Sequence, residues 1–309
     1  MRIRPALLAL IAVTAAIIVA AGVLHWTNRA TTTGAKPSAA KTTGKAKAVK
    51  PVKEVPELTL PDPLPNRTIK VPILMYHRIA VLQGDEPAVT QALTVDPGEF
   101  RLQMQWLKER GYTTITQLQL FKALEQGGPL PDKPIMLTFD DGYRGIATIA
   151  APIMSQAGFV GTAYVITDRI AVNPKRAPTW LTWRQLRILE QRGWDIGSHT
   201  VSHTEIPHMS ETAALQTLRA SRFALERRLG HPVQWFCYPA GAVDAKSVDW
   251  VRKAGYVLAT TTQEGDVHSA ADPLRLSRVR VSNTTGVRDR KSTRLNSSHE
   301  WISRMPSSA

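Results

Sequence analysis

Short apolar runs alternate with amphipathic stretches between residues 71 and 281, and this alternation constrains the fold more than any other feature. The apolar runs predict strands at residues 72–76, 135–139, 161–166, 195–198, 235–238, 256–261 and 276–281. The amphipathic stretches predict helices at residues 97–110, 118–126, 145–156, 182–192, 211–229 and 245–253. Repeated strand–helix units of this size predict an α/β fold with a parallel sheet or barrel, in which chemistry is expected at the carboxyl ends of the strands.

The composition argues against two other kinds of protein. Cys237 is the only cysteine in the 309 residues, so an internal disulfide and a zinc site built from several thiolates are both excluded. The formal net charge is +14, but residues 61–288 carry 26 basic against 21 acidic side chains without a basic run. We therefore expect no nucleic-acid partner.

The N-terminal region differs from the rest of the chain. Residues 5–24 follow Arg2 and Arg4 and contain no charged residue. About 20 such residues are enough to cross a bilayer as a helix, so residues 1–26 are predicted to be a membrane anchor, with a cleaved signal peptide as the alternative. Residues 27–65 are rich in Ala, Lys, Thr and Pro and predict a flexible linker.

The C-terminal region also breaks the pattern. Residues 289–299 read DRKSTRLNSSH, which is the in-frame translation of a widely used sequencing-library adapter. We interpret residues 289–309 as non-native and exclude His299 and Glu300 from every site. The globular domain is therefore predicted to span residues 66–288.

Two carboxylates follow one of the predicted strands. Asp140 and Asp141 come directly after the run at residues 135–139 and just before Gly142. An Asp-Asp-Gly sequence by itself is more often ordinary turn chemistry than a site. Its place at the carboxyl end of a strand makes it a candidate.

Two histidines follow another predicted strand. His199 and His203 come after the run at residues 195–198, and their spacing puts both imidazoles on one face if a helical turn begins there. Such a pair can chelate one metal ion, although an isolated pair is more often solvent-facing. Two imidazoles and one carboxylate are a common catalytic ligand set that leaves positions open for water.

The chain from about residue 71 to residue 285 resembles the polysaccharide deacetylases of carbohydrate esterase family 4, also called the NodB-homology domain. The resemblance rests on TFDDGY at 138–143, SHTVSH at 198–203 and FCYPAG at 236–241, in the family's order. It implies a distorted (β/α) barrel and the metal-dependent removal of N-acetyl groups from a glycan.

Further segments resemble the branch that contains the extracytoplasmic poly-β-1,6-N-acetylglucosamine deacetylases. They are LMYHRI at 74–79 and PLRLSRVRV at 273–281, together with FCYPAG. In that branch the histidine that serves as general acid lies near the start of the domain. His77 occupies the matching position here.

The resemblance implies a role for each motif residue. One divalent ion, zinc in preference to cobalt or nickel, would be held by Asp141, His199 and His203. Asp140 would be the general base that takes a proton from the attacking water, and protonated His77 would give a proton to the departing amine. The backbone N–H of Ala240 would donate to the developing oxyanion.

The third motif departs from the family pattern at two positions. Cys237 stands where the family usually has an arginine that orients the catalytic base, and Ala240 replaces the aromatic residue before the glycine. Asp140 thus lacks its usual partner, and we hypothesise that Arg278 or Arg280 reaches it from a later strand. Cys237 itself is interpreted as a small buried thiol and not as a nucleophile.

A further set of residues is predicted to contact the glycan: Tyr143, Tyr238, Trp180 and Arg278. Tyr143 and Trp180 are candidates for stacking against sugar rings. Trp183 begins a predicted helix, where an aromatic side chain more often packs in the core.

These observations predict a membrane-anchored N-deacetylase, with its domain on the periplasmic or cell-wall side, that releases acetate from a polymer containing N-acetylglucosamine. Partially acetylated poly-β-1,6-N-acetylglucosamine is the leading substrate, and peptidoglycan and chitin-like oligomers are the alternatives. The competing hypothesis is a non-catalytic glycan-binding module on the same barrel. Asp140 and His77 argue against it, because a binding module needs neither a free base nor an acid.

Overall fold

The computed structural model describes residues 56–172 and 178–284. The predicted membrane anchor, residues 27–55 of the predicted linker and the adapter-like segment at 289–309 lie outside these residues. Within the described ranges, no helix is long and apolar enough to cross a membrane.

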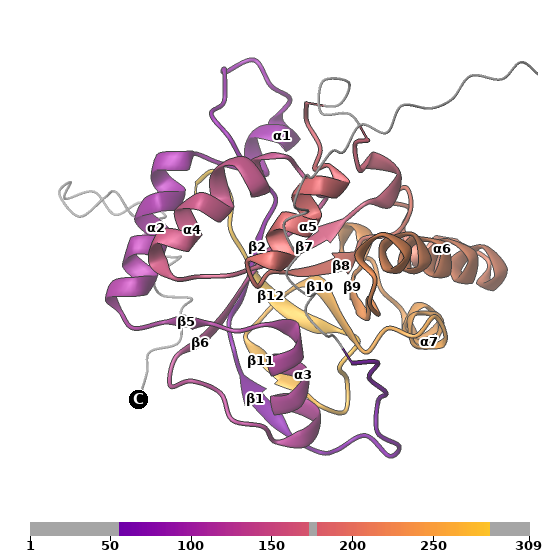
Figure 1. Cartoon of the computed structure of the whole chain (residues 1–309). Coiled ribbons are helices and arrows are strands. Elements are labelled where there is room, and N and C mark those ends of the chain that lie inside the picture. Colours follow the sequence, from indigo (N-terminus) through magenta and orange to yellow (C-terminus); the bar gives the residue numbers. More distant parts are fainter. Residues whose placement is uncertain (1–55, 173–177, 285–309) are drawn as a thin grey trace, which may run out of the picture. The chain divides into compact units, whose positions relative to one another are not determined.

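Seven parallel strands close into a barrel at the centre of the domain (Figure 1). These strands are β2 (Ile73–Tyr76), β6 (Pro134–Phe139), β7 (Thr162–Val165), β8 (Asp195–Ser198), β9 (Trp235–Cys237), β10 (Leu258–Glu264) and β12 (Leu276–Arg280). They are ordered β2-β12-β10-β9-β8-β7-β6, and the pairing of β6 with β2 closes the ring. The predicted α/β barrel is confirmed.

The seven predicted strands all occur, with ends that differ by three residues or fewer. Five short strands and one short helix were not predicted: β1 (Thr68–Lys70), β3 (Arg78–Ile79), α1 (Ala88–Ala92), β4 (Thr94–Val95), β5 (Thr113–Thr114) and β11 (Val267–Ser269). Segments this short are missed because two to five residues are too few to show a hydrophobic period.

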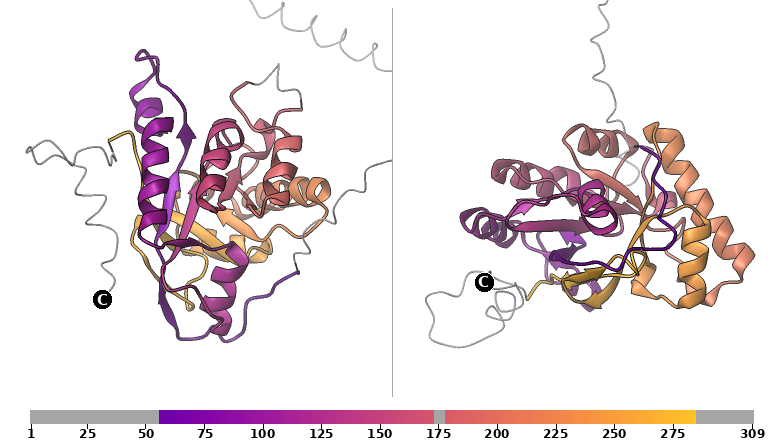
Figure 2. Two further views of the ribbon diagram at one scale, coloured as in Figure 1. Left: turned by 60° about the vertical axis from the view of Figure 1, so that its left-hand side comes forward. Right: turned by 90° about the horizontal axis from the view of Figure 1, so that it is seen from below.

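Helices surround the strands, as two further views show (Figure 2). They are α2 (Pro97–Glu109), α3 (Gln117–Gln126), α4 (Ala151–Ala157), α5 (Trp183–Gln191), α6 (Glu211–Leu229) and α7 (Ala245–Lys253). Side-chain caps at Asp96, Thr116 and Thr182 begin three of them by accepting backbone N–H bonds. Gly127 and Gly230, both in the left-handed conformation, end α3 and α6.

The helix predicted at 145–156 is divided in two. A π-helical turn covers Ile146–Ala150, and α4 begins only at Ala151. Pro152 explains the division, because a proline has no N–H to continue the ladder of hydrogen bonds from the preceding turn.

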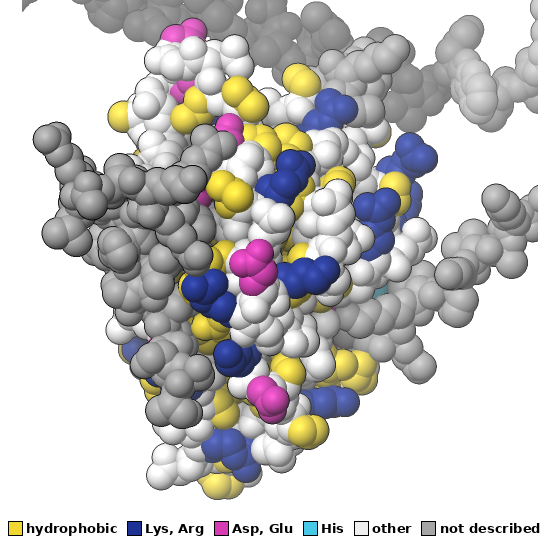
Figure 3. Space-filling view, turned by 90° about the vertical axis from the view of Figure 1, so that its left-hand side faces the viewer, with side chains coloured by type: hydrophobic (Ala, Val, Ile, Leu, Met, Phe, Trp, Pro, Cys, Tyr) yellow, Lys and Arg dark blue, Asp and Glu magenta, His cyan; other side chains and the backbone are white. Residues whose placement is uncertain are grey.

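Strands β2, β7 and β9 are buried along their whole length, which explains why their sequences are largely apolar. All four residues of β2 and of β7 are buried. The polar side chains that could perform chemistry therefore come where the strands end. On the face drawn in Figure 3, Lys and Arg side chains are interspersed with acidic and hydrophobic ones, in keeping with the nearly balanced charge of the domain.

Candidate active site

The predicted motifs meet because parallel strands bring their carboxyl ends to one end of the barrel. Asp140 and Asp141 directly follow β6, and His199 directly follows β8. Cys237 is the last residue of β9, and His77 is the first residue after β2. Five side chains from four strands thereby share one small region.

Asp141, His199 and His203 form a compact cluster. Asp141 Oδ1 lies 3.6 Å from His199 Nε2 and 3.5 Å from His203 Nε2. One ligand atom from each residue lies within 4.8 Å of the other two. Two imidazole nitrogens and a carboxylate oxygen at these separations fit a single divalent ion.

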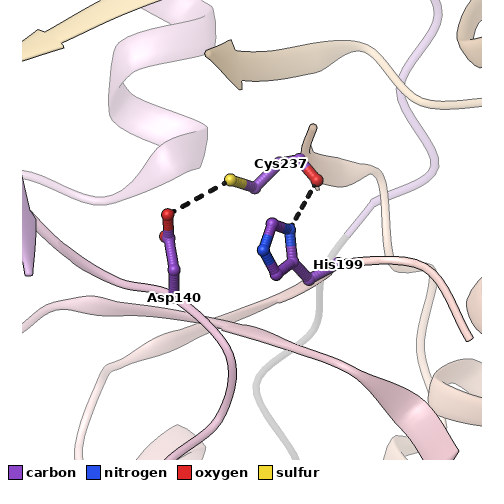
Figure 4. A group of neighbouring side chains, drawn as sticks. All are labelled: Asp140, His199 and Cys237. Carbon is purple, nitrogen blue, oxygen red and sulfur yellow. Dashed lines mark hydrogen bonds between the residues drawn. The ribbon is translucent and has the colours of Figure 1, made fainter. Parts of the chain in front are cut away.

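The ring of His199 is fixed by the backbone of β9. Its Nδ1 lies 2.7 Å from the carbonyl oxygen of Cys237 (Figure 4). A carbonyl only accepts, so Nδ1 donates and carries the proton. The lone pair is thus left on Nε2, which is the nitrogen nearest Asp141, and this is the usual arrangement of a metal-binding histidine.

The helical turn predicted for His199 and His203 does not form. The segment is a tight turn in which Thr200 and His203 have φ values of 64° and 66°, and the His203 N–H donates to Thr200 Oγ1 at 2.9 Å. Asp141 has a φ of 71° as well. Left-handed backbone costs about 1 kcal/mol or more at each non-glycine residue, so its concentration at two predicted ligands indicates a backbone held in place for function.

Asp140 has a different partner. Arg278 Nη1 donates to Asp140 Oδ1 at 2.8 Å, and Nη2 donates to Oδ2 at 2.7 Å. Arg278 also donates from Nε to the carbonyl of Thr261 at 2.7 Å and from Nη1 to Thr138 Oγ1 at 3.1 Å. Arg278 thus supplies the arginine that the third motif lacks, whereas the neighbouring Arg280 is exposed.

This ion pair is buried, and it sets the charge of Asp140. Burial by itself would raise the pKa of Asp140, but the charge and hydrogen bonds of Arg278 outweigh it and hold the pKa well below its usual range. The side chain of Arg278 is 0% exposed. The prediction that Arg278 contacts the glycan is therefore wrong, because its side chain is enclosed by the protein and paired with Asp140.

Asp140, His199 and Cys237 form a second group whose ligand atoms are close together (Figure 4). The Cys237 thiol donates to Asp140 Oδ2 at 3.5 Å, and Arg278 Nη2 lies 3.2 Å from its sulfur. Burial raises the pKa of this thiol far above its ordinary value, so it stays neutral and is a poor ligand. A guanidinium already supplies the positive charge here, so the group of Asp141, His199 and His203 is the better candidate for a metal site.

His77 lies on the Asp140 side of the site. Its Nε2 is 3.9 Å from Asp140 Oδ2, and its side chain is 12% exposed. Burial lowers the pKa of His77, and the charges of Asp140 and Asp141 partly offset that effect. Its Nδ1 is buried and has no hydrogen-bond partner among the described residues.

The predicted glycan contacts fare unevenly. Tyr238 is fully buried, with its ring centroid 5.0 Å from that of Phe236, so the prediction that it binds substrate is wrong. Tyr143 and Trp180 stack on each other with centroids 4.7 Å apart, which takes up one face of each ring, and their contact with the glycan stays a prediction. Ala240 is exposed and has a φ of 54°, and its oxyanion role stays a prediction.

Two residues of this region were not predicted. Arg78 lies over the Tyr143 ring at 5.1 Å, and Arg169 lies over the Trp180 ring at 4.8 Å. Arg78 lies in the LMYHRI segment, but only His77 was singled out there, and Arg169 lies in no quoted motif. Each arginine is brought to its ring by the fold, which no sequence signal revealed.

Comparison with known proteins identifies the family. A family model described as polysaccharide deacetylase matches residues 127–259. The crystal structure of a polysaccharide deacetylase from Bacillus cereus is 30% identical to the chain, with a TM-score of 0.61, and the match covers 71% of this chain and 67% of that protein. The chain belongs to the polysaccharide deacetylase family.

Two further relatives of this polysaccharide deacetylase are informative. A Streptococcus pyogenes deacetylase, solved in complex with acetate, is 28% identical with a TM-score of 0.65, over 71% of this chain and 96% of that one. The poly-β-1,6-N-acetyl-D-glucosamine N-deacetylase of Staphylococcus epidermidis is 26% identical over 229 residues, which cover 68% of this chain and 78% of that protein. The chain is an enzyme, a polysaccharide N-deacetylase.

Proposed function

We propose that this enzyme uses one divalent metal ion to remove N-acetyl groups from a polymer containing N-acetylglucosamine. The observation that carries the proposal is the different environment of two adjacent carboxylates. Asp141 faces two imidazoles, whereas Asp140 is held by a guanidinium. The name of the Staphylococcus epidermidis relative makes poly-β-1,6-N-acetylglucosamine the first substrate to test.

Asp141, His199 and His203 would hold the ion, and zinc is the first candidate because imidazole suits it well. When bound, the ion would polarise the acetamide carbonyl and make a bound water more acidic. The cluster is buried except at His203, whose side chain is 33% exposed. This leaves His203 as the ligand nearest to solvent.

Asp140 acts as the general base. Arg278 keeps it ionised and fixes its plane, at the cost of lower basicity. A carboxylate offers about four lone-pair positions, and the two hydrogen bonds from Arg278 use one on each oxygen. A remaining lone pair takes a proton from the water as the water oxygen attacks the acetamide carbon.

His77 acts as the general acid. Its lowered pKa makes the protonated ring a better donor to the amine nitrogen when the C–N bond breaks. The proton that Asp140 took from water then passes to His77, whose Nε2 is 3.9 Å from Asp140 Oδ2, and this restores the protonated ring. The products are acetate and a glucosamine unit. The Ala240 N–H would stabilise the oxyanion, a contribution of about 3 to 4 kcal/mol in comparable sites.

The test is acetate release from poly-β-1,6-N-acetylglucosamine, peptidoglycan and chitin-like oligomers, measured before chelation, after chelation and after zinc or cobalt is added back. We expect acetate from the first polymer, its loss on chelation and its recovery with metal. Glycan binding without acetate release from any polymer would instead establish the non-catalytic module. Full activity in metal-free protein would overturn the role of the ion.

A further inference from the structure

Four side chains form a stack beside the predicted metal ligands. The rings of Tyr143 and Trp180 lie 4.7 Å apart between centroids, with an angle of 22° between their planes. The guanidinium of Arg78 is 5.1 Å from the Tyr143 centroid, and that of Arg169 is 4.8 Å from the Trp180 centroid. We call these four residues the arginine–aromatic stack.

One half of the stack is attached to the Asp141 motif. Tyr143 comes two residues after Asp141, close enough that this carboxylate adds to the effect of burial in raising the pKa of its hydroxyl. Tyr143 is bridged through its backbone to Trp180, and the Leu181 N–H donates to the Gly142 carbonyl at 2.9 Å. The TFDDGY segment therefore fixes the position of Trp180.

The arginines are attached to the other two parts of the site. Arg78 directly follows His77, the predicted general acid. Arg169 ends a short 3₁₀ helix (Thr167–Arg169) in which the Thr167 N–H donates to the Thr200 carbonyl at 3.2 Å. Thr200 directly follows His199, so each arginine is held next to a residue that the mechanism uses.

Neither arginine is closely paired with a carboxylate, although backbone hydrogen bonds and, to a lesser extent, the charge of Arg78 lower the pKa of Glu86. Neither guanidinium forms an ion pair with a carboxylate of residues 56–172 or 178–284. Both side chains are half-buried, so they keep some contact with solvent. Stacking on an aromatic ring holds a planar guanidinium in place without removing its charge. The result is two fixed positive charges at the edge of the site.

This charge matters because the reaction changes the charge of its substrate. An N-acetylglucosamine unit is neutral, whereas the glucosamine unit left after deacetylation carries an ammonium group near neutral pH. We propose that Arg78 and Arg169 disfavour a glucosamine unit next to the acetylated unit that reacts, so that the enzyme selects runs of neutral units. This inference rests on the proposed function and names a specificity determinant for it.

The size of the effect follows from Coulomb's law. At a separation of about 8 Å and an effective dielectric constant of about 30 to 60, between the values typical of a protein surface and of water, one guanidinium weakens the binding of an ammonium group by about threefold to tenfold. The screening length falls to about 3 Å in 1 M salt, so the discrimination should fade there. A contact that depended on shape alone would persist in salt.

The experiment uses three synthetic β-1,6-linked pentasaccharides and the full chain loaded with zinc. The first is fully N-acetylated, the second has glucosamine beside the unit that reacts, and the third has glucose at that position. Glucose is neutral but also lacks the acetyl group, so it separates charge from lost contacts. We expect kcat/KM, measured by acetate release, to fall about threefold to tenfold for glucosamine relative to glucose in low salt.

Variants then locate the effect. Arg78→Gln and Arg169→Gln should each bring the ratio of kcat/KM for the glucose pentasaccharide to kcat/KM for the glucosamine pentasaccharide closer to one. The corresponding Lys variants should keep the wild-type ratio because they keep the positive charge. Arg110→Gln is the matched control, since Arg110 lies 3.9 Å over the Trp106 ring at the end of α2. That end of α2 precedes β5, and it lies at the opposite end of the barrel from the site.

The outcomes separate the two proposals. Equal kcat/KM for the glucosamine and glucose pentasaccharides in wild-type enzyme would overturn this inference. An unchanged ratio of these two kcat/KM values in the Arg78→Gln/Arg169→Gln double variant would also overturn it. An equal loss of kcat/KM on all three substrates in both the Gln and the Lys variants would show that the stack is only structural, and would overturn it as well. No acetate from the fully acetylated pentasaccharide would overturn the proposed function itself.

Discussion

The two sides of His199 contain similar residues but differ in what balances their charge. On one side, Asp141 faces the imidazoles of His199 and His203, and no lysine or arginine of the described residues forms an ion pair with it. On the other side, Asp140 and Cys237 are also within ligand distance, but a buried Arg278 bridges them. Adjacent carboxylates thus acquire different roles from their partners: one is left to bind a cation, and the other already has one.

Removing a ligand from the first side should have the largest effect. In His203→Ala, we expect the metal content per chain to fall toward zero and kcat to drop about 1,000-fold or more, because a Lewis acid supplies several kcal/mol and about 4 kcal/mol corresponds to that factor. Elemental analysis and acetate release measure the two quantities. Cys237→Ala is the matched control on the other side and should keep its metal. Metal retained by His203→Ala would place the ion elsewhere.

Asp140→Asn should come next. Loss of a general base lowers kcat by about 100-fold to 10,000-fold, while the metal content stays that of wild type because Asp140 is not a ligand. Circular dichroism checks that the fold survives with Arg278 unpaired. Loss of both metal and activity would contradict the division of roles between Asp140 and Asp141.

Arg278 should affect both stability and the pH profile. Arg278→Met leaves a buried carboxylate unpaired, which costs about 3 to 5 kcal/mol of unfolding free energy and is measured by denaturant titration. Asp140 works when ionised, so activity is lost as the pH falls through its pKa. Without Arg278 that pKa rises, and the acid limb of kcat/KM should move to higher pH.

Two checks keep the Arg278 prediction testable. Arg278→Lys retains the positive charge if the Met variant does not fold, and it should shift the acid limb less. Arg280→Ala, two residues along the same strand but exposed, should leave both stability and pH profile unchanged. In wild type, the pair should stabilise the fold fully above about pH 4, the unfolded pKa of Asp, and less as the pH falls below it. An unshifted profile in both Arg278 variants would refute the positioning role.

The smallest effect should come from Cys237→Ser. A neutral thiol donates only a weak hydrogen bond to Asp140 at 3.5 Å, and a hydroxyl can replace it. We expect kcat within about threefold of wild type, which is under about 1 kcal/mol, and an unchanged metal content. A loss of metal in this variant would give the second group a role in binding the ion.

Much of the fold could be predicted because its signals are local. A strand buried on both faces favours a continuous apolar run, and β2, whose sequence is ILMY, was predicted at 72–76 and occurs at Ile73–Tyr76. The helices α6 and α7 were predicted with their bounds as well. The division at Pro152 was missed because an apolar period can continue across a break in the hydrogen-bond ladder.

The candidate site was predictable only in part. Asp141, His199 and His203 could be grouped because each follows a strand, and the ends of parallel strands meet. The direction in which a side chain points could not be predicted in the same way. Tyr238 stands in a site motif, yet its ring packs against Phe236 in the core, which sequence position did not reveal.

The sequence by itself determined the barrel, the position of the carboxylates and imidazoles at strand ends, and the absence of an arginine at Cys237. Only the tertiary structure decided that Arg278, 138 residues from Asp140, is the arginine that pairs with it, and that Arg78 and Arg169 lie on the Tyr143–Trp180 stack. The physical reason is that hydrophobic periodicity is set by neighbours along the chain. Ion pairs and ring contacts depend on separations of a few ångströms between distant segments, which exist only once the barrel has closed.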